Sequence, residues 1–415
     1  ESALSATDDG VSNTAIGNSA MGIGNAGTAN TAVGSQSMID VTGNYNTAVG
    51  MQSLFDITSG VSNVAVGALA LKFANAGESN NIAIGVEAMR DVKENGNTAD
   101  SNIALGSLAM TGGTLGGDFI GNIAIGDRAM DATGTNAQTG TIAIGHHSLT
   151  ALTSGTKNVA IGYKAGESYN GSNSTIIGYE AGLDADGGAT DSTLIGMEAG
   201  KHLDDATYNT AIGIEAMKSN SGGSNTAIRN TAIGWRAGDL IRTGSDNVVI
   251  GHGAEVSATD AVNQIAIGKE TQGVSNNSVT LGNTDVTAVH MAQDSHATVY
   301  SGGEQIKGSG NHTMWRVVNN TMADGVEWDT GIDTSQSFFA FVGTIESDNT
   351  NGDTAMIRCA SGTITLVQGN QGYITVDSST VASSRTGFYS TSNTLRVKTG
   401  FANGIDVSIA IMSAT

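Results

Sequence analysis

The sequence predicts an all-β fibrous protein whose first two thirds form a parallel β-roll, a solenoid built from short strands. Three observations point to this class. The pentapeptide Asn-Thr-Ala-Ile-Gly, or a close relative, recurs sixteen times between residues 11 and 283. The 415 residues include 58 glycines and no proline. β-Branched side chains occupy fixed places in every repeat, and this regularity distinguishes the chain from a disordered one rich in glycine and serine.

Each pentapeptide is expected to form the strand of one solenoid turn. Its second position is always Thr, Val or Ile, and its fourth is always Ile, Val or Leu, from Ile16 to Leu281. These two positions share one face of a strand, because side chains alternate. We expect this pair to fill the interior of the turn, and the glycine to form the bend that ends the strand. At about 4.8 Å per turn, the repeats predict a shaft on the order of 75 Å long.

The third position of the pentapeptide points to the opposite face and is usually alanine. A row of small apolar side chains is unusual for a solvated face and suits close contact with another chain. Many turns have only 16–18 residues, which leaves one chain little interior of its own. We therefore expect a homo-oligomer of closed cyclic symmetry, the alternative being a monomeric solenoid. The predicted interface comprises Ala15, Ala32, Ala48, Ala65, Ala83, Ala104, Ala124, Ala143, Ala160, Ala211, Ala232 and Ala266.

Beyond Gly282 the pentapeptide stops and the composition changes. We assign residues 1–283 to the β-roll shaft, 284–310 to a neck and a Gly/Ser-rich linker, and 311–415 to a C-terminal head. The head contains nine of the nineteen aromatic residues and several short alternating runs bounded by Gly, Asn, Asp or Ser. About eight short strands with regular turns predict a β-sandwich of jelly-roll type.

The net charge of −21 excludes several classes of partner. An acidic surface repels phosphates, so we expect no binding of nucleic acid. No apolar run approaches the ~18 residues of a membrane-spanning helix, so we expect no membrane insertion. The single cysteine, Cys359, cannot form an intrachain disulfide, and stability must therefore come from packing and assembly.

The sequence offers little catalytic chemistry. It contains no Gly-x-Ser-x-Gly elbow and no His-Glu-x-x-His motif, and we expect no catalytic residue, no cofactor and no bound metal. His146 and His147 follow Gly145, and adjacent strand residues point apart, so we expect them not to share a metal within one chain. His290 and His296 lie in the neck, where three copies could meet on a threefold axis; solvated or stacked imidazoles are the alternative.

Two acidic segments leave other chemistries open. Asp204 and Asp205 lie in a variable loop, and a glycosidase would need two carboxylates at a fixed separation, which could come from different chains. The segment 184–188 reads Asp-Ala-Asp-Gly-Gly and invites a calcium interpretation, although it lacks the full EF-hand spacing.

The repeat resembles the head repeat of trimeric autotransporter adhesins. Asn81-Ile82-Ala83-Ile84-Gly85, followed by Ala88, matches the core of that pattern. The repeats here are longer and less regular, and Asn directly precedes the β-branched residue. In both respects they are more similar to the roll repeats of bacteriophage tail fibres, as in residues 158–166, and residues 278–283 resemble the exit from such rolls. The resemblance covers residues 11–283 and implies a homotrimer.

We therefore expect a structural fibre of a bacteriophage virion, held by other tail or baseplate proteins and presenting a receptor-binding tip to a host cell-surface glycan or protein. The alternatives are the head of a bacterial trimeric adhesin and a polysaccharide-degrading tailspike. Aromatic residues favour binding surfaces, so we assign receptor contact to Trp328 and Tyr389, which lie in polar, Gly-bounded segments expected to be loops. Either residue could instead fold back onto the core.

Overall fold

The structure is a computed structural model. It describes Ala3, residues 10–289 except 23–26, 57, 74–76, 93–97, 114–116, 133–136, 186–187 and 220–224, and the strands between residues 315 and 413. The chain divides into two units, Glu1–Val289 and His290–Thr415. Each unit is all-β in its described residues, which contain no helix long and apolar enough to cross a membrane.

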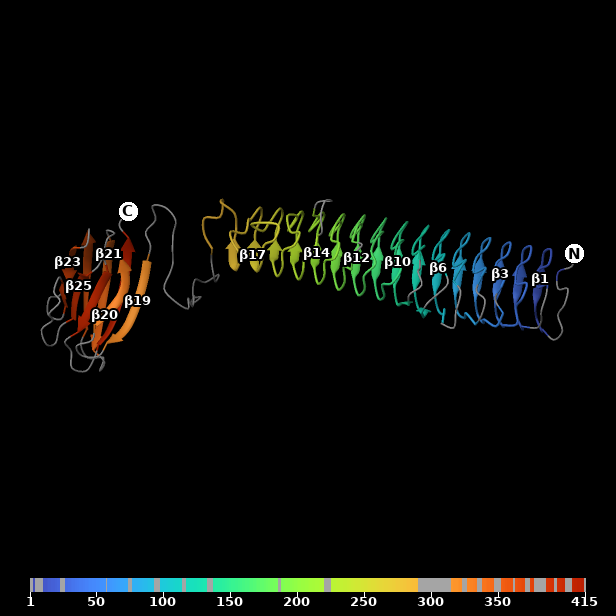
Figure 1. Cartoon of the computed structure of the whole chain (residues 1–415), viewed down its shortest axis with the longest axis horizontal. Helices are drawn as coiled ribbons and strands as arrows, with labels where there is room; N and C mark the ends of the chain where they lie inside the picture. Colours follow the sequence, from blue (N-terminus) through green and yellow to red (C-terminus); the bar gives the residue numbers. More distant parts are fainter. Residues whose placement is uncertain are drawn as a thin grey trace. The chain divides into compact units, whose positions relative to one another are not determined.

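The first unit is a parallel β-solenoid, as predicted. Each pentapeptide contributes one short strand to a single sixteen-stranded sheet, in which every strand pairs in parallel with the strand of the next turn (Figure 1). A separate two-stranded sheet joins β7 (Phe119–Ile120) to β9 (Gln138–Thr139). The strands of the main sheet are β1 (Thr14–Ile16), β2 (Thr31–Val33), β3 (Thr47–Val49), β4 (Val64–Val66), β5 (Ile82–Ile84), β6 (Ile103–Leu105), β8 (Ile123–Ile125), β10 (Ile142–Ile144), β11 (Val159–Ile161), β12 (Thr175–Ile177), β13 (Thr193–Ile195), β14 (Thr210–Ile212), β15 (Thr231–Ile233), β16 (Val248–Ile250), β17 (Gln264–Ile267) and β18 (Ser278–Leu281).

The two faces of this sheet are opposite to those expected from the sequence. The alanines predicted to face another chain lie inside the coil of their own chain, where they form the core with no exposed surface. Only Ala15, in the first strand, is partly exposed. A turn of 16–18 residues is too narrow for two layers of large side chains, so alanine fills the interior and the β-branched pair faces outward. The alanines that were predicted to form the interface, and that instead face the interior of the coil, are Ala15, Ala32, Ala48, Ala65, Ala83, Ala104, Ala124, Ala143, Ala160, Ala211, Ala232 and Ala266.

Side-chain sizes inside the coil are matched from turn to turn. The fourth residue after a motif glycine is usually a buried Met or Leu, such as Met110. Where the strand instead carries a large inward residue, Ile176 or Leu194, the neighbouring fourth positions are glycines. A Cβ on Gly182 would lie 3.1 Å from Leu194 Cδ1, and one on Gly200 only 2.7 Å from Leu194 Cδ2. The constant cross-section therefore depends on this exchange of volume, because interiors are close-packed.

The motif glycine is required by the stacking of turns. At Gly126 φ is +135°, and a Cβ would lie 2.5 Å from the carbonyl oxygen of Gly145 in the next turn. Backbone atoms of that turn cannot move away without breaking the parallel pairing. A side chain is therefore excluded at this corner by sterics as well as by the backbone angle.

The first residue of the motif forms a buried ladder of side-chain hydrogen bonds. The backbone N–H of Asn122 donates to Asn102 Oδ1 at 3.0 Å, and the N–H of Asn102 donates to Asn81 Oδ1 at 2.9 Å. The Nδ2 of Asn102 also donates to the carbonyl of Phe119 at 2.8 Å. Each asparagine thus pairs polar backbone groups that would otherwise be buried without partners.

The second unit contains two sheets. A five-stranded sheet has the order β19 (Trp315–Met322), β27 (Ile405–Ser413), β21 (Phe338–Glu346), β22 (Gly352–Ala360) and β23 (Thr363–Gly369), and a four-stranded sheet has the order β20 (Glu327–Asp333), β26 (Thr394–Thr399), β25 (Thr386–Thr391) and β24 (Ile374–Val376). All described pairings are antiparallel except β24 with β25. The jelly-roll connection of these strands stays a prediction.

Candidate functional site

The outer face of the sixteen-stranded sheet is a continuous apolar surface. The second and fourth residues of every pentapeptide point outward in two columns, and all of them are Thr, Val, Ile or Leu. Their exposure is substantial in the single chain, for example 39% at Ile84 and 36% at Ile161. We call this surface the sheet face, and contiguous exposed apolar surfaces of this kind commonly mark sites of interaction with another chain.

A ladder of rings runs along the corner that follows the motif glycines. His146 and Tyr163, each the first residue after such a glycine, stack with ring centroids 5.3 Å apart, and Tyr179 stacks on Tyr163 at 5.2 Å. Trp235 and His252 repeat the arrangement further along, at 4.6 Å. Equivalent positions on parallel-paired turns lie one above another, so identical places in the repeat produce the ladder.

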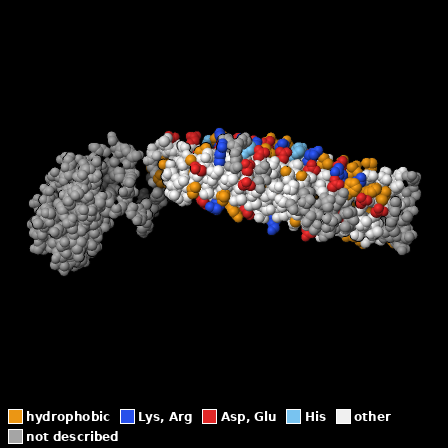
Figure 2. All heavy atoms as spheres, viewed as in Figure 1, with side chains coloured by type: hydrophobic (Ala, Val, Ile, Leu, Met, Phe, Trp, Pro, Cys, Tyr) orange, Lys and Arg blue, Asp and Glu red, His pale blue; other side chains and the backbone are white. Residues whose placement is uncertain are grey.

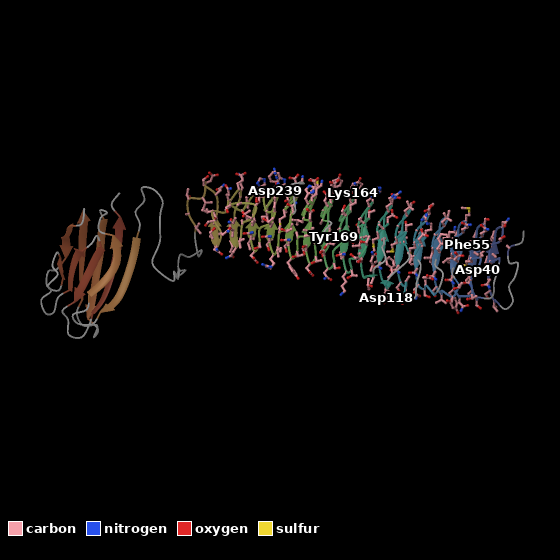
Figure 3. The ribbon with its side chains drawn as sticks, viewed as in Figure 1. Asp40, Phe55, Asp118, Lys164, Tyr169 and Asp239 are labelled. Atoms are coloured by element: carbon pink, nitrogen blue, oxygen red, sulfur yellow. The ribbon has the colours of Figure 1, made fainter. Side chains whose placement is uncertain are left out.

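Charged side chains gather along one long edge of the shaft (Figure 2). Lys164 and Asp239 lie on this edge, whereas Asp118 lies on the opposite one (Figure 3). The charges pair both within and between turns: Lys201 Nζ lies 2.6 Å from Glu180 Oε2 of the preceding turn and 2.8 Å from Glu198 Oε1 of its own turn. Hydrogen bonds from Lys201 lower the pKa of both carboxyls. The ion pairs of Lys201 with Glu180 and of Lys218 with Glu198 join adjacent turns, which is sufficient to explain why the charges lie there.

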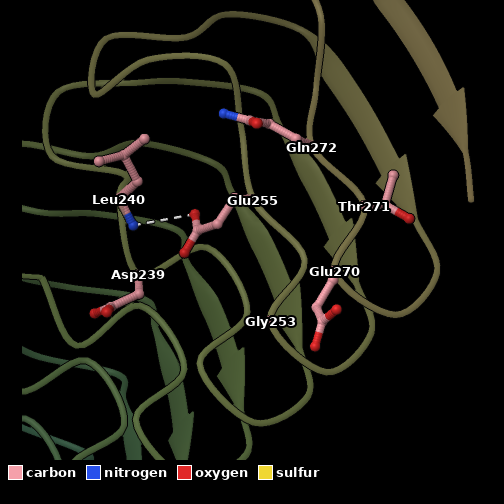
Figure 4. Close-up of a pocket in the computed structure, with 7 residues that line it drawn as sticks. All are labelled: Asp239, Leu240, Gly253, Glu255, Glu270, Thr271 and Gln272. Carbon is pink, nitrogen blue, oxygen red and sulfur yellow. Dashed lines mark hydrogen bonds between the residues drawn. The ribbon is translucent and has the colours of Figure 1, made fainter. Parts of the chain in front are cut away.

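A hollow of about 310 Å³ lies on the shaft between β15 and the end of the sheet, lined by three carboxylates together with Thr271 and Gln272. The carboxylates are those of Asp239, Glu255 and Glu270 (Figure 4). Asp239 is paired with Arg236 Nη2 at 2.8 Å. Glu255 Oε2 accepts a hydrogen bond from the backbone N–H of Leu240 at 3.1 Å.

Glu255 is held in an apolar position. It is the fourth residue after Gly251, the place that Met89, Met110 and Met217 fill in other turns. Burial, opposed by the Leu240 hydrogen bond and reinforced by the charge of Asp239, raises the pKa of Glu255 to about 7. A carboxyl group of this kind can carry a proton near neutral pH and can donate it. The sequence signal was present, since an acid interrupts the Met/Leu/Gly series at this position.

One expectation about ligand residues is changed by the geometry. His146 and His147 do come together, contrary to the expectation, with ring centroids 4.2 Å apart. They lie in the turn after Gly145, as expected, but His147 has a φ of 57°, so the alternation of strand side chains does not apply to them. Asp184 of the acidic loop pairs with His202 Nδ1 at 2.8 Å. Residues 186 and 187 of that loop, and His290 and His296 of the neck, lie outside the described residues.

The receptor residues assigned from the sequence lie in strands, so the loop prediction for both was wrong. Trp328 belongs to β20 and is paired with Val397, whereas Tyr389 belongs to β25 and is paired with Arg396. Positions 396 and 397 are neighbours on β26, and neighbouring rows of a sheet belong to opposite faces. Positions 328 and 389 therefore do not share one face of the four-stranded sheet. Whether either residue contacts a receptor stays a prediction.

Comparisons with known proteins add a weak similarity to a solved structure. No family model and no curated protein matches the chain. Among solved structures, the tailspike protein of Acinetobacter phage vB_ApiP_P1 is similar at 12% identity, with a TM-score of 0.20, over 99% of this chain and 80% of that one. The chain is thus a β-solenoid protein with weak structural similarity to a phage tailspike, and at this TM-score the similarity carries no argument about its role.

Proposed function

We propose that this chain is the subunit of a trimeric fibre on a bacteriophage virion. Three parallel copies associate through the sheet face, and the C-terminal unit of each is presented to the host cell. The repeats that resemble phage tail-fibre rolls support the virion assignment. The adhesin alternative shares the same assembly and differs only in the particle that carries the fibre.

The observation that carries the proposal is the sheet face itself. It is apolar in every row, it carries no charged residue among its second and fourth motif positions, and it repeats at the strand spacing of about 4.8 Å. A second copy of the same shaft, aligned in parallel, has the matching period along its whole length. Cyclic symmetry about an axis along the shaft closes the assembly and places all C-terminal units at one end.

Light scattering of the purified full chain tests the assembly. We expect three times the 41.8 kDa mass of one chain, and electron microscopy should show rods with a shaft on the order of 75 Å long. A monomeric chain at micromolar concentration would overturn the proposal. Labelling intact virions with an antibody against the chain distinguishes a tail fibre from a bacterial adhesin, which would label cells instead.

The Glu255 hollow is the feature that bears on the alternative of a polysaccharide-degrading tailspike. Glycoside hydrolysis needs one carboxyl that is protonated near neutral pH and one that is ionised. Glu255 meets the first requirement, and Asp239 and Glu270 line the same hollow. Sustained release of reducing sugar from host capsule, abolished in Glu255→Gln, would establish this function. We expect no release, in keeping with a purely structural and binding role.

A further inference from the structure

A second cluster of titratable side chains lies midway along the shaft, separate from the sheet face and the Glu255 hollow. Asp127 and His146 are each the first residue after a motif glycine, in consecutive turns, so the parallel register stacks one above the other. His147 follows directly in the same turn as His146. One carboxylate oxygen and one nitrogen from each imidazole all lie within 4.8 Å of one another.

We propose that Asp127, His146 and His147 form a site for a divalent transition metal of the zinc type. Two imidazoles and one carboxylate form a donor set that suits zinc, nickel and copper, and disfavours magnesium and calcium, which prefer oxygen ligands.

The spacing of the donor atoms suits such an ion. Asp127 Oδ2 and His146 Nε2 lie 3.4 Å apart, close to the ~3.3 Å that separates two ligands in a tetrahedral zinc site with bonds of about 2.0 Å. Both side chains are 45% exposed, so an ion can enter from solvent and small rotations can complete the coordination. The fourth position remains open to water.

A second carboxylate orients the site. Glu167 Oε1, on the following turn, lies 3.1 Å from His147 Nδ1, and its other oxygen lies 3.0 Å from Lys164 Nζ. A hydrogen bond from Nδ1–H to this carboxylate leaves Nε2 of His147 as the metal ligand, the arrangement commonly found behind metal-binding histidines. Tyr163, stacked on His146 with ring centroids 5.3 Å apart, restricts the orientation of the His146 imidazole.

The ion would connect consecutive turns at the middle of the shaft. Asp127 follows β8 and His146 follows β10, so coordination spans the gap between two neighbouring strands. Because the ion would bind the folded turns and not the unfolded chain, it would stabilise the solenoid by mass action. The inference concerns one chain and does not depend on assembly or on the proposed fibre role.

Isothermal titration of the full chain with zinc chloride, on protein purified without a histidine tag, tests the site. We expect one zinc ion per chain, and at least a tenfold loss of affinity in both Asp127→Asn and His146→Asn. The matched control is His252→Asn, because His252 occupies the same repeat position and also stacks on an aromatic ring but has no neighbouring histidine. The control should bind as the unchanged chain does.

Thermal unfolding gives an independent readout. Zinc should raise the unfolding temperature of the unchanged chain and of His252→Asn, and should leave that of His146→Asn unaltered. Circular dichroism checks that each variant is folded. The proposal fails if no zinc binds, if His252→Asn weakens binding as much as His146→Asn, or if His146→Asn still binds with undiminished affinity.

Discussion

At the scale of single residues, the solenoid is specified by polar groups that are buried with their partners. Asn102 is fully buried, accepts a hydrogen bond from the backbone N–H of Asn122 in the next turn and donates one to the carbonyl of Phe119 in β7. Ser174 and Ser192 hold the equivalent place in later turns, where Ser174 Oγ still accepts from the backbone N–H of Ser192 at 3.0 Å. The essential property is thus an acceptor at this site, and asparagine adds a second bond.

Asn102→Ala should destabilise the middle turns by about 2–4 kcal/mol, because it leaves the N–H of Asn122 and the carbonyl of Phe119 buried without partners. Asn102→Ser should cost less, since a hydroxyl can still accept. Hydrogen exchange of peptides spanning β6 and β8 measures both effects locally, which suits a solenoid whose turns open separately. Equal exchange in the two variants would contradict the ladder.

Glu255 makes stability depend on pH in the direction opposite to most acidic residues. The folded chain retains its proton up to pH about 7, whereas the ordinary pKa is 4.5. Between these values the folded state binds more protons, so the free energy of unfolding falls as pH rises. The favourable contribution of Glu255 to the free energy of unfolding is complete below pH 4.5 and is lost above pH about 7.

Glu255→Gln should therefore stabilise the shaft by about 1–3 kcal/mol at pH 8 and have little effect at pH 4. Its amide oxygen can still accept from Leu240. Denaturant unfolding at the two pH values measures the difference, and Glu270→Gln is the control, because the side chain of Glu270 is 56% exposed. A stabilisation of the same size at both pH values would show that charge burial is not the cause.

At the scale of the strand, the sequence determined the alternation of side chains but not which face of the strand points into the coil. The alternation in Val159-Ala160-Ile161 separates two faces without ambiguity, and the parallel register it implies is observed. The choice of interior face was wrong because large β-branched residues normally belong inside. Here the interior width is set by how close two backbone layers approach across a short turn, a tertiary quantity that no single repeat encodes. The glycine at position 182, next to the large inward side chain of Leu194, is a sequence feature that indicates this width.

Adjacent residues of one strand now give a matched test of the two faces. Ala160 has no exposed surface, whereas Ile161 is 36% exposed. Ala160→Arg should prevent the local turns from folding, because an unpaired charge would be buried within the coil. The double variant Ile84→Arg/Ile161→Arg should fold but yield monomers, because the charges meet in the assembled sheet face.

Light scattering and circular dichroism distinguish these outcomes. Ala258→Arg, on an exposed position in the loop between β16 and β17, is the control and should remain folded and assembled. A folded trimer of the Ile84→Arg/Ile161→Arg variant would remove the sheet face as the interface.

At the scale of the whole molecule, the candidate sites were harder to predict than the fold. The repeat predicted the solenoid because every turn contains the same pattern of β-branched residues and glycine. The histidine cluster and the Glu255 hollow each depend on residues from different turns, and their proximity follows from the register rather than from any local motif. For the second unit, strand positions such as β21 and β27 followed from alternation, whereas β20 was mistaken for a loop because of its glycine and acidic residues.

Attachment to the host should depend on the C-terminal unit. In a competition assay, residues 301–415 should block attachment, and the shaft alone should not. Because positions 328 and 389 belong to opposite faces of one sheet, at most one of Trp328→Ala and Tyr389→Ala, made in the full chain, should weaken blocking. Tyr208→Ala, a shaft residue 58% exposed, is the control. Blocking by the shaft alone would assign recognition to the shaft loops.

The uniform register of the main sheet has a consequence for how the length of the shaft can evolve. From β1 to β17 each turn pairs three backbone positions in parallel with the turn before and after it, so one turn can be removed or duplicated without changing the backbone pairing of its neighbours. Deleting residues 142–158 joins Thr141 to Val159 and lets β8 pair with β11 as it now pairs with β10. The shaft would be shorter by about 4.8 Å. Reach toward a surface can therefore be adjusted in unit steps by gene duplication, provided that the interior side chains of the turns brought together fit one another.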